Sequence, residues 1–372
     1  MKVLCNREKL RDALSIANQL VPTKTTKPVL ENVCLVATDH SLEFLATDQE
    51  VAMRYTLDDV QVADTGVAVI PARIAMEVVR DLSGEMCQIE MIGSRCRLSS
   101  NLDHCDLVTA DPDEFPVIGR FEATKHISIQ GGVLTKLIAQ TSFAAAREPG
   151  RYAMHGIQVS LQGDHLQLVA TDGRRLAKVS SPVDTQGVTT EPLIVPTRGM
   201  QLFSRVIADP LDQVHLEFSA DRIGMRTRGA QVFSRVIEGQ FPIYDALFPE
   251  EHKYEVQVNR DVFGQKLRLA ASVGQEQGVR MQLTADKLNL FVRSVSRGEA
   301  EASMEAIYQG EESEIAFRPD FVLDGVKRCE SDQLTLCFNG PSSPGEFRLG
   351  DQYRYVVMPV TIDTRPVAAA TS

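Results

Sequence analysis

The chain has 372 residues, of which 43% are hydrophobic and 24% charged; these proportions are normal for a soluble globular protein of two or three domains. No run of about eighteen apolar residues is present, which argues against a membrane span. The N-terminal segment lacks an apolar signal core, so we expect no secretion. The net charge of −11 argues against a protein whose whole surface coats nucleic acid.

The cysteines and histidines point to no metal or disulfide chemistry. The seven cysteines are an odd count with no Cys-x-x-Cys pair, which argues against a disulfide framework or a zinc ribbon and favours a reducing cytosol. The seven histidines never pair at a metal-ligand spacing. We therefore predict neither a metal nor a cofactor.

Each third of the chain opens with the same pair of elements. A short alternating strand is followed by an amphipathic helix. The strands are expected at 1–6, 125–130 and 254–259, and the helices at 7–18, 132–147 and 260–271.

A second strand pattern recurs with a period of 124 residues. The segments "SLEFLATDQEVAMRY" and "HLQLVATDGRRLAKV" both place Ala-Thr-Asp after an alternating apolar run, and Asp48 and Asp172 lie 124 residues apart. A third copy, "KLNLFVRSVSRGEAEASM", has Ser294 in the same place. Alternation with period two indicates half-buried strands, so these three residues are expected at the turns into the next strand.

Two further blocks follow in the same order. A short apolar strand ends at Pro71, Pro196 and Phe317, and helices are expected at 73–82, 198–209 and 318–329. Phe-Pro pairs lie at 115–116 and 241–242. Repeats of this kind indicate copies of one structural unit. We predict an α+β fold of three repeated domains, each with two helices packed on antiparallel sheets.

The predicted domain boundaries fall where the sequence resembles a linker, at 119–125 and at 249–253. The domains are then 1–120, 121–249 and 250–362. A tail, 363–372, is expected to be disordered.

Positive charge is concentrated in the six predicted helices. They hold fifteen Lys or Arg and eight Asp or Glu, although the whole chain is acidic. One interpretation is that these are ordinary solvated helix faces. The other is that all six helices line one cationic surface, which would hold a polyanion inside an acidic exterior.

Three motifs, together with the threefold repeat, resemble the bacterial DNA sliding clamp family, the beta subunit of DNA polymerase III. They are "ATDGRRLA" at 170–177, "FPIY" at 241–244 and "YVVMPV" at 355–360. The resemblance covers residues 1 to about 362 and implies a head-to-tail homodimeric ring, lined by helices, that encircles and slides on duplex DNA. It implies a non-catalytic processivity factor, cytoplasmic and nucleoid-associated. Its expected partners are the polymerase III catalytic subunit, the clamp loader, other polymerases, and mismatch-repair or ligase factors.

The resemblance also implies a pocket for partner peptides that carry Gln and a Leu-Phe end. Methionine and aliphatic side chains suit a cleft that accepts many sequences, and glycine allows close approach of a peptide. Carried over by motif, the pocket comprises Met154, Thr171, Gly173, Arg174, Arg175, Leu176, Pro242, Leu247, Phe321, Val356, Val357, Met358 and Pro359.

Candidate DNA-lining residues come from the predicted helices and from the loop "VPTKTTKPV". No base-reading motif is present, as expected of a protein that slides. The candidates are Lys24, Lys27, Arg73, Arg80, Lys136, Arg147, Arg151, Tyr152, Arg198, Arg205, Lys266 and Arg268. For the contact between two chains, we expect residues 102–108 of one chain to meet the helix near 270–273 of the other.

Two other classes of protein compete with this interpretation. An enzyme would need a site, and the best local cluster is Asp103, His104, Cys105 and Asp106. On a strand, His104 and Asp106 share one face and Cys105 points to the other, so a Cys–His pair cannot form there. A repeat scaffold that binds proteins but not DNA would keep the peptide pocket and lack the cationic lining.

Overall fold

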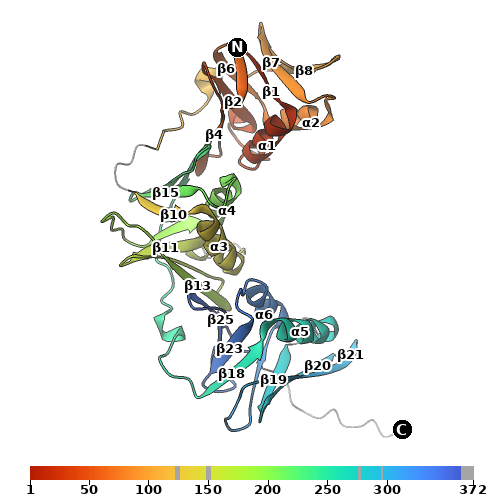
Figure 1. Ribbon diagram of the computed structural model, residues 1–372, viewed down its shortest axis with the longest axis vertical. Coiled ribbons are helices and arrows are strands. Elements are labelled where there is room, and N and C mark those ends of the chain that lie inside the picture. Colours follow the sequence, from red (N-terminus) through yellow and green to blue (C-terminus); the bar gives the residue numbers. More distant parts are fainter. Residues whose placement is uncertain (122–125, 148–151, 275–277, 295, 362–372) are drawn as a thin grey trace. The chain divides into compact units, whose positions relative to one another are not determined.

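The computed structural model describes residues 1–121, 126–147, 152–274, 278–294 and 296–361. Within them, each third of the chain repeats one order of elements, as the sequence predicts. Strand–helix, then three or four strands, then a strand–helix pair and three strands recur in all three copies (Figure 1). The prediction of three α+β repeats with antiparallel sheets is confirmed.

The first repeat contains one strand more than the others. Its elements are β1 (Lys2–Asn6), α1 (Arg7–Asn18), β2 (Asn32–Ala37), β3 (Leu42–Thr47), β4 (Val51–Leu57), β5 (Val60–Asp64), β6 (Gly66–Pro71), α2 (Ala72–Asp81), β7 (Met86–Ile92), β8 (Arg95–Ser100) and β9 (Asp103–Val108).

The second and third repeats follow the same order without a counterpart of β5. The second has β10 (Ile127–Gln130), α3 (Gly131–Thr141), β11 (Gly156–Gln162), β12 (His165–Thr171), β13 (Arg175–Pro182), β14 (Leu193–Pro196), α4 (Thr197–Val206), β15 (Gln213–Phe218), β16 (Arg222–Arg226) and β17 (Ala230–Arg235). The third has β18 (Tyr254–Asn259), α5 (Arg260–Gly274), β19 (Val279–Thr284), β20 (Lys287–Ser294), β21 (Gly298–Glu305), β22 (Ser313–Phe317), α6 (Pro319–Val326), β23 (Gln333–Phe338), β24 (Gly345–Arg348) and β25 (Tyr353–Val357).

Asparagine side chains start the first helix of two repeats. The side chain of Asn6 accepts hydrogen bonds from the backbone N–H groups of Glu8 and Lys9. Asn259 does the same for Asp261 and Val262. Because the first N–H groups of a helix have no partner within it, such caps fix where α1 and α5 begin.

Three predicted helices end at least three residues earlier than expected. Helix α3 ends at Thr141, where the hydroxyl bonds back to Leu137 O and a short 3₁₀ turn, Ser142–Ala144, follows. Helix α4 ends at Val206, shortly before Pro210, and α6 ends at Val326. In addition, Ser294 is the last residue of β20 and pairs with Gly298, so it lies in the strand and not in the turn.

The strands do not stay within their repeats. The chain forms two compact units: residues 1–135 with 183–237, and residues 136–182 with 238–372. In the first unit, one sheet has the order β5-β1-β7-β8-β9 and the other β10-β15-β16-β17-β4-β3-β2-β6. The second sheet therefore joins strands of the first and second repeats through the β4–β17 pairing.

The second unit is built on the same plan. The strands that this unit contributes to its long sheet run β11-β12-β13-β25-β24-β23-β18, and its short sheet runs β21-β20-β19-β22. Here the β13–β25 pairing joins the second and third repeats. Helix α1 packs against α2 in the first unit and α5 against α6 in the second (Figure 1). No helix in the described ranges has the length and apolar character needed to cross a membrane.

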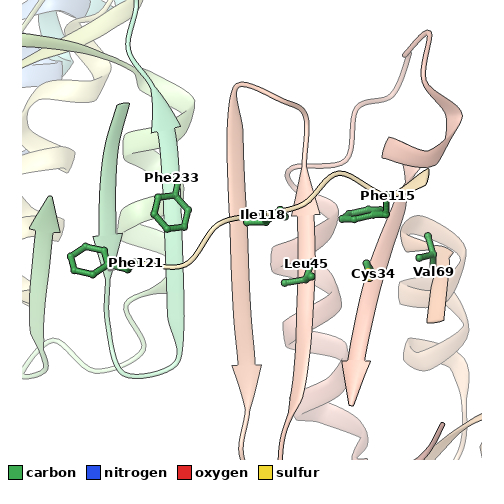
Figure 2. Close-up of a cluster of buried hydrophobic side chains, with 7 residues drawn as sticks. All are labelled: Cys34, Leu45, Val69, Phe115, Ile118, Phe121 and Phe233. Carbon is green, nitrogen blue, oxygen red and sulfur yellow. The ribbon is translucent and has the colours of Figure 1, made fainter. Parts of the chain in front are cut away.

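The segment that leads into the first predicted linker is packed on the sheet, whereas residues 122–125 of that linker lie outside the described residues. Residues 115–121, which we call the first linker, cross one face of the long sheet while helices lie behind the strands (Figure 2). The linker and the sheet share one buried cluster: Cys34, Leu45, Val69, Phe115, Ile118, Phe121 and Phe233. Arg54 donates to Ile118 O at 2.9 Å and to Glu43 at 2.6 Å, which fixes the segment to the strands.

Residues 241–252, which overlap the second predicted linker at 249–253 and which we call the second linker, are held in a similar way. His252 Nε2 lies 2.9 Å from Glu346 Oε2, and both side chains are almost fully buried. Arg354 forms a forked ion pair with the same carboxylate. Burial works against ionisation of Glu346, but the bonds from Arg354 and His252 keep its pKa below the ordinary value.

Candidate functional site

The repeated Ala-Thr-Asp motif builds a tight turn between two strands. After β12, Thr171 Oγ1 donates to Arg175 O at 2.7 Å and accepts from the N–H of Gly173 at 3.0 Å. Asp172 Oδ1 accepts the N–H groups of Arg174 and Arg175. Each polar group of the motif is thus used locally, which explains why Thr and Asp are needed in this order.

The turn is hydrogen-bonded to the segment that follows β25. We call the turn 171–175 and the β13–β25 pairing together the second junction. Leu176 lies directly opposite Val356 in the ladder, and Met358 N donates to Arg174 O at 2.8 Å. The last strand of the chain is therefore fixed in register against the motif. This brings "TDGRRL" and "YVVMP" together, as the resemblance implies.

An apolar patch lies on one face of this junction. Leu176, Val356 and Val169 form its buried floor. Side chains of the second linker pack on it: Phe241, Tyr244, Leu247 and Phe248. Tyr244 is anchored further by bonds with Gln158 and Gln167. Of the predicted pocket residues, Leu176, Leu247 and Val356 thus meet in one place, and half-buried Pro242 belongs to the same linker.

Arg175 and Val357 lie on the opposite face, because they form the next pair in the ladder. Arg175 donates to Asp172 at 3.0 Å, to Asp324 at 2.7 Å and to Phe143 O at 2.9 Å. Its guanidinium also stacks over the ring of Phe321 at 4.7 Å.

The surroundings of Arg175 decide its role. Burial opposes its charge, but Tyr355, Asp324 and Asp172 hold its pKa above the ordinary value. These hydrogen bonds all go to groups of the protein itself. Arg175 therefore locks the turn to α6, and Phe321 is part of that lock instead of the apolar patch.

The remaining predicted pocket residues lie outside the buried floor of the patch. Gly173 has φ +84°, a left-handed conformation that glycine adopts without strain, and it is exposed together with Arg174. Met358 is also exposed, and Pro359 is half-buried. Met154 is half-buried, and its carbonyl accepts from Ala146 N.

Most candidate DNA-lining residues are exposed cations, but three of them have partners. Arg80 forms an ion pair with Asp81, and Lys136 with Glu330. Arg198 binds Asp48 and donates to Gln19 O, so it locks a turn of the first unit. Lys266 is half-buried, and Arg151 lies outside the described residues, as does the side chain of Tyr152. The exposed remainder is Lys24, Lys27, Arg73, Arg147, Arg205 and Arg268.

Family models match almost the whole chain. Residues 1–119 match the N-terminal domain of the DNA polymerase III beta subunit, 128–243 its central domain and 245–361 its C-terminal domain.

The chain belongs to the DNA polymerase III beta subunit family.

Relatives and solved structures of this family extend over the same length. The beta sliding clamp of Escherichia coli K12 is 26% identical over 367 residues, which is 97% of this chain and 100% of that protein. The crystal structure of the DNA polymerase III beta subunit from Pseudomonas aeruginosa has a TM-score of 0.89 at 26% identity, again over 97% and 100%. The sliding clamp of Bacillus subtilis, at 24% identity and TM-score 0.92 over 98% and 100%, has the same fold.

Several residues around the second junction of this beta subunit were not predicted from the sequence. The aromatic residues of "FPIYDALF" signal an anchored linker, yet only Pro242 and Leu247 were selected from it. Glu346, His252 and Arg354 gave no signal, because they are far apart in the sequence and meet only through strand pairing. Arg328 was also missed; it stacks over Phe143 at 4.2 Å and donates to Ala139 O.

The rival catalytic cluster is an ordinary part of the sheet. Asp106 forms a forked ion pair with Arg97 across β8 and β9, and His104 lies opposite Ser99 while Cys105 lies opposite Leu98. The predicted separation of His104 and Cys105 on two faces is confirmed. Within the described part of the chain, no three His, Cys, Asp or Glu side chains are grouped to hold a metal ion.

The predicted chain–chain contact is only partly exposed. Leu102 and Val108, at the two ends of β9, are strongly exposed. Ala270 is buried within its own unit, whereas its neighbours Leu269 and Ser272 on α5 are exposed. The predicted tail, 363–372, lies outside the described residues.

Proposed function

We propose that this beta subunit is a sliding clamp, a homodimeric ring that encircles duplex DNA and tethers polymerases, the clamp loader and repair factors. It is a non-catalytic processivity subunit. Family membership along almost the whole chain carries this proposal. The protein acts in the cytoplasm with the replication machinery, and we propose that it is associated there with the nucleoid.

The sheet topology supports head-to-tail closure. Within each unit, one sheet is long because two repeats contribute strands to it, and the other is short because only one repeat does. Strands β9 and β21 stand at the ends of the short sheets. Since unpaired strand edges favour pairing with another chain, β9 of one copy and β21 of a second can complete each other and close a ring.

Retention on DNA is then a matter of topology and not of strong phosphate contacts. The exposed cations of the helices and of the 24–27 loop balance the acidic chain locally and let DNA pass without a firm grip. Tight contacts would slow sliding. We propose Lys24, Lys27, Arg73, Arg147, Arg205 and Arg268 as the lining, together with Arg151 and Tyr152, for which the structure gives no side-chain support.

The peptide pocket is proposed at the second junction. Its centre is the patch of Leu176, Val356 and Leu247, with Met358, Gly173 and Arg174 at the rim. These side chains offer an adaptable apolar surface beside a turn whose Gly173 is exposed. We assign Arg175, Val357 and Phe321 a supporting role beneath it.

Topological binding is tested with a linear duplex fixed to beads at one end. Protein is added while the other end is open, and that end is then blocked with streptavidin. Because a threaded ring is not held by charge, we expect it to survive a high-salt wash and to leave when a nuclease cuts the duplex. The matched control blocks the end before protein is added. If the salt wash removes the protein equally in both cases, the clamp proposal fails.

A further inference from the structure

The first unit contains a counterpart of the second junction. We call it the first junction: the turn 47–51 and the β4–β17 pairing. Thr47 Oγ1 donates to Val51 O at 2.8 Å and accepts from Gln49 N, while Asp48 Oδ1 accepts the N–H groups of Glu50 and Val51. This is the same set of bonds that the 171–175 turn makes.

The strand pairing beyond the turn is equivalent as well. Ala52 lies opposite Phe233, as Leu176 lies opposite Val356 in the second junction. Arg235 N donates to Glu50 O at 2.8 Å, the counterpart of Met358 N to Arg174 O. The first linker then supplies Phe115-Pro116, where the second supplies Phe241-Pro242.

A cavity of about 310 Å³ opens at the first junction. It lies between the 47–50 turn, residues 116–119 of the first linker and the facing ends of β16 and β17. Ala52, Ile118 and Phe233 supply its apolar surface, and Figure 2 shows Ile118 and Phe233 on the linker and the adjoining strand. All of these residues belong to one unit.

The polar rim of this cavity differs from that of the second junction. Arg222 and Arg235 are both exposed at its edge, and Glu50 is the carboxylate that lines the cavity with them. The Arg222 guanidinium lies over the Phe233 ring at 5.5 Å and 3.9 Å from Glu217. Where the second junction has Met358, this one has Arg235. On a chain with a net charge of −11, two arginines beside an aromatic floor form a local site for an anionic group next to an apolar one.

We propose that the first junction binds a short acidic peptide segment of a partner protein. An apolar side chain of the peptide packs on Phe233 and Ala52, and a neighbouring carboxylate binds Arg222 and Arg235. The choice of a peptide as the occupant rests on the proposed function of the second junction. The cavity and its charge are observed independently of that function. The chain then carries two docking sites that read different sequences.

The proposal is tested by fluorescence anisotropy with a labelled Asp-Asp-Ala-Leu-Phe peptide and its uncharged match, Asn-Asn-Ala-Leu-Phe. The protein variants are Arg222→Gln/Arg235→Gln, the charge reversal Arg222→Glu/Arg235→Glu, and a control, Arg228→Gln, at an exposed arginine of the β16–β17 turn. We expect the neutral variant to weaken binding of the acidic peptide about tenfold, the reversal to weaken it further, and the control to leave it unchanged.

A second-junction variant, Leu247→Ala/Met358→Ala, separates the two sites. The proposal requires that this variant bind the acidic peptide as the wild type does, while it loses a Gln-Ala-Ala-Leu-Phe peptide. Three results would overturn the inference: no saturable binding of the acidic peptide, equal binding of the Asn peptide, or loss of binding only in the second-junction variant. Failure of the Gln peptide to bind the wild type would instead count against the proposed function.

Discussion

The two junctions share a backbone but differ in nearly every side chain that faces outward. Both use a Thr-Asp turn with the same four kinds of hydrogen bond, and both fix the following strand through one backbone bond to the turn. The locks differ: Arg175 belongs to the turn itself, whereas Arg198 comes from α4 and reaches Asp48. The repeats therefore share the backbone hydrogen bonds that the fold requires. We expect docking specificity to depend on the outward side chains, which differ between them.

The largest contrast is expected between the two locking arginines. Arg175 is 10% exposed and binds two carboxylates and a carbonyl, whereas Arg198 is 49% exposed. Loss of Arg175 removes one cation from Asp172 and one from Asp324, so Arg175→Ala should cost about 3 kcal/mol, against under about 1 kcal/mol for Arg198→Ala. Urea unfolding measures the free energy of unfolding of each variant. Hydrogen exchange should show lost protection at 170–180 in the first variant only; equal effects would show that the locks are equivalent.

Peptide affinity should separate the junctions next. Removing Leu247 and Met358 takes apolar surface from the second junction without touching its buried floor. We expect Leu247→Ala/Met358→Ala to weaken the Gln-Ala-Ala-Leu-Phe peptide about 30-fold, or ~2 kcal/mol, by isothermal titration. Ile307→Ala, at another exposed apolar residue of the same unit, is the control. An unchanged dissociation constant would move the peptide site elsewhere.

The linker of the second unit should respond to acid through Glu346. Its folded-state pKa lies below the ordinary value of 4.5, so its stabilising effect is complete above that pH and is lost as the pH falls through the folded pKa. We expect Glu346→Gln to cost about 2 kcal/mol at neutral pH and to show a flatter loss of stability below pH 4.5. Melting curves over this range check the difference, and parallel pH profiles would contradict it.

The smallest change in stability is expected at the left-handed position of each turn, which is Gln49 in the first junction and Gly173 in the second. Gln49 has φ +78° where the second junction has Gly173 at φ +84°. A left-handed conformation strains glutamine but not glycine, so Gln49→Gly should stabilise the first unit by about 0.5–1 kcal/mol and Gly173→Gln should destabilise the second by a similar amount. Chemical denaturation of both variants measures the signs. Equal signs would mean that the two turns are not equivalent.

The sequence predicted the repeat, the order of elements and the turns because these depend on local patterns of period and turn chemistry. It could not predict the split of the pocket residues between two faces, which follows from the pairing of Arg175 with Val357 across the chain. Arg198 was assigned to the DNA lining on its charge alone, although it binds Asp48. The sequence predicts linkers at 119–125 and 249–253, but nothing local reveals that Phe121 and His252 are buried.

Strands of one repeat complete a sheet with strands of the next. One sequence repeat is therefore not expected to fold as an isolated fragment. A fragment ending near residue 120 would lose the partner of β4, and one beginning near 250 would lose the partner of β25. Each fragment would expose the unpaired edge of a strand that lies inside a sheet in the full chain. Such edges promote aggregation. The boundaries of one sequence repeat therefore do not define a fragment that keeps its sheets intact.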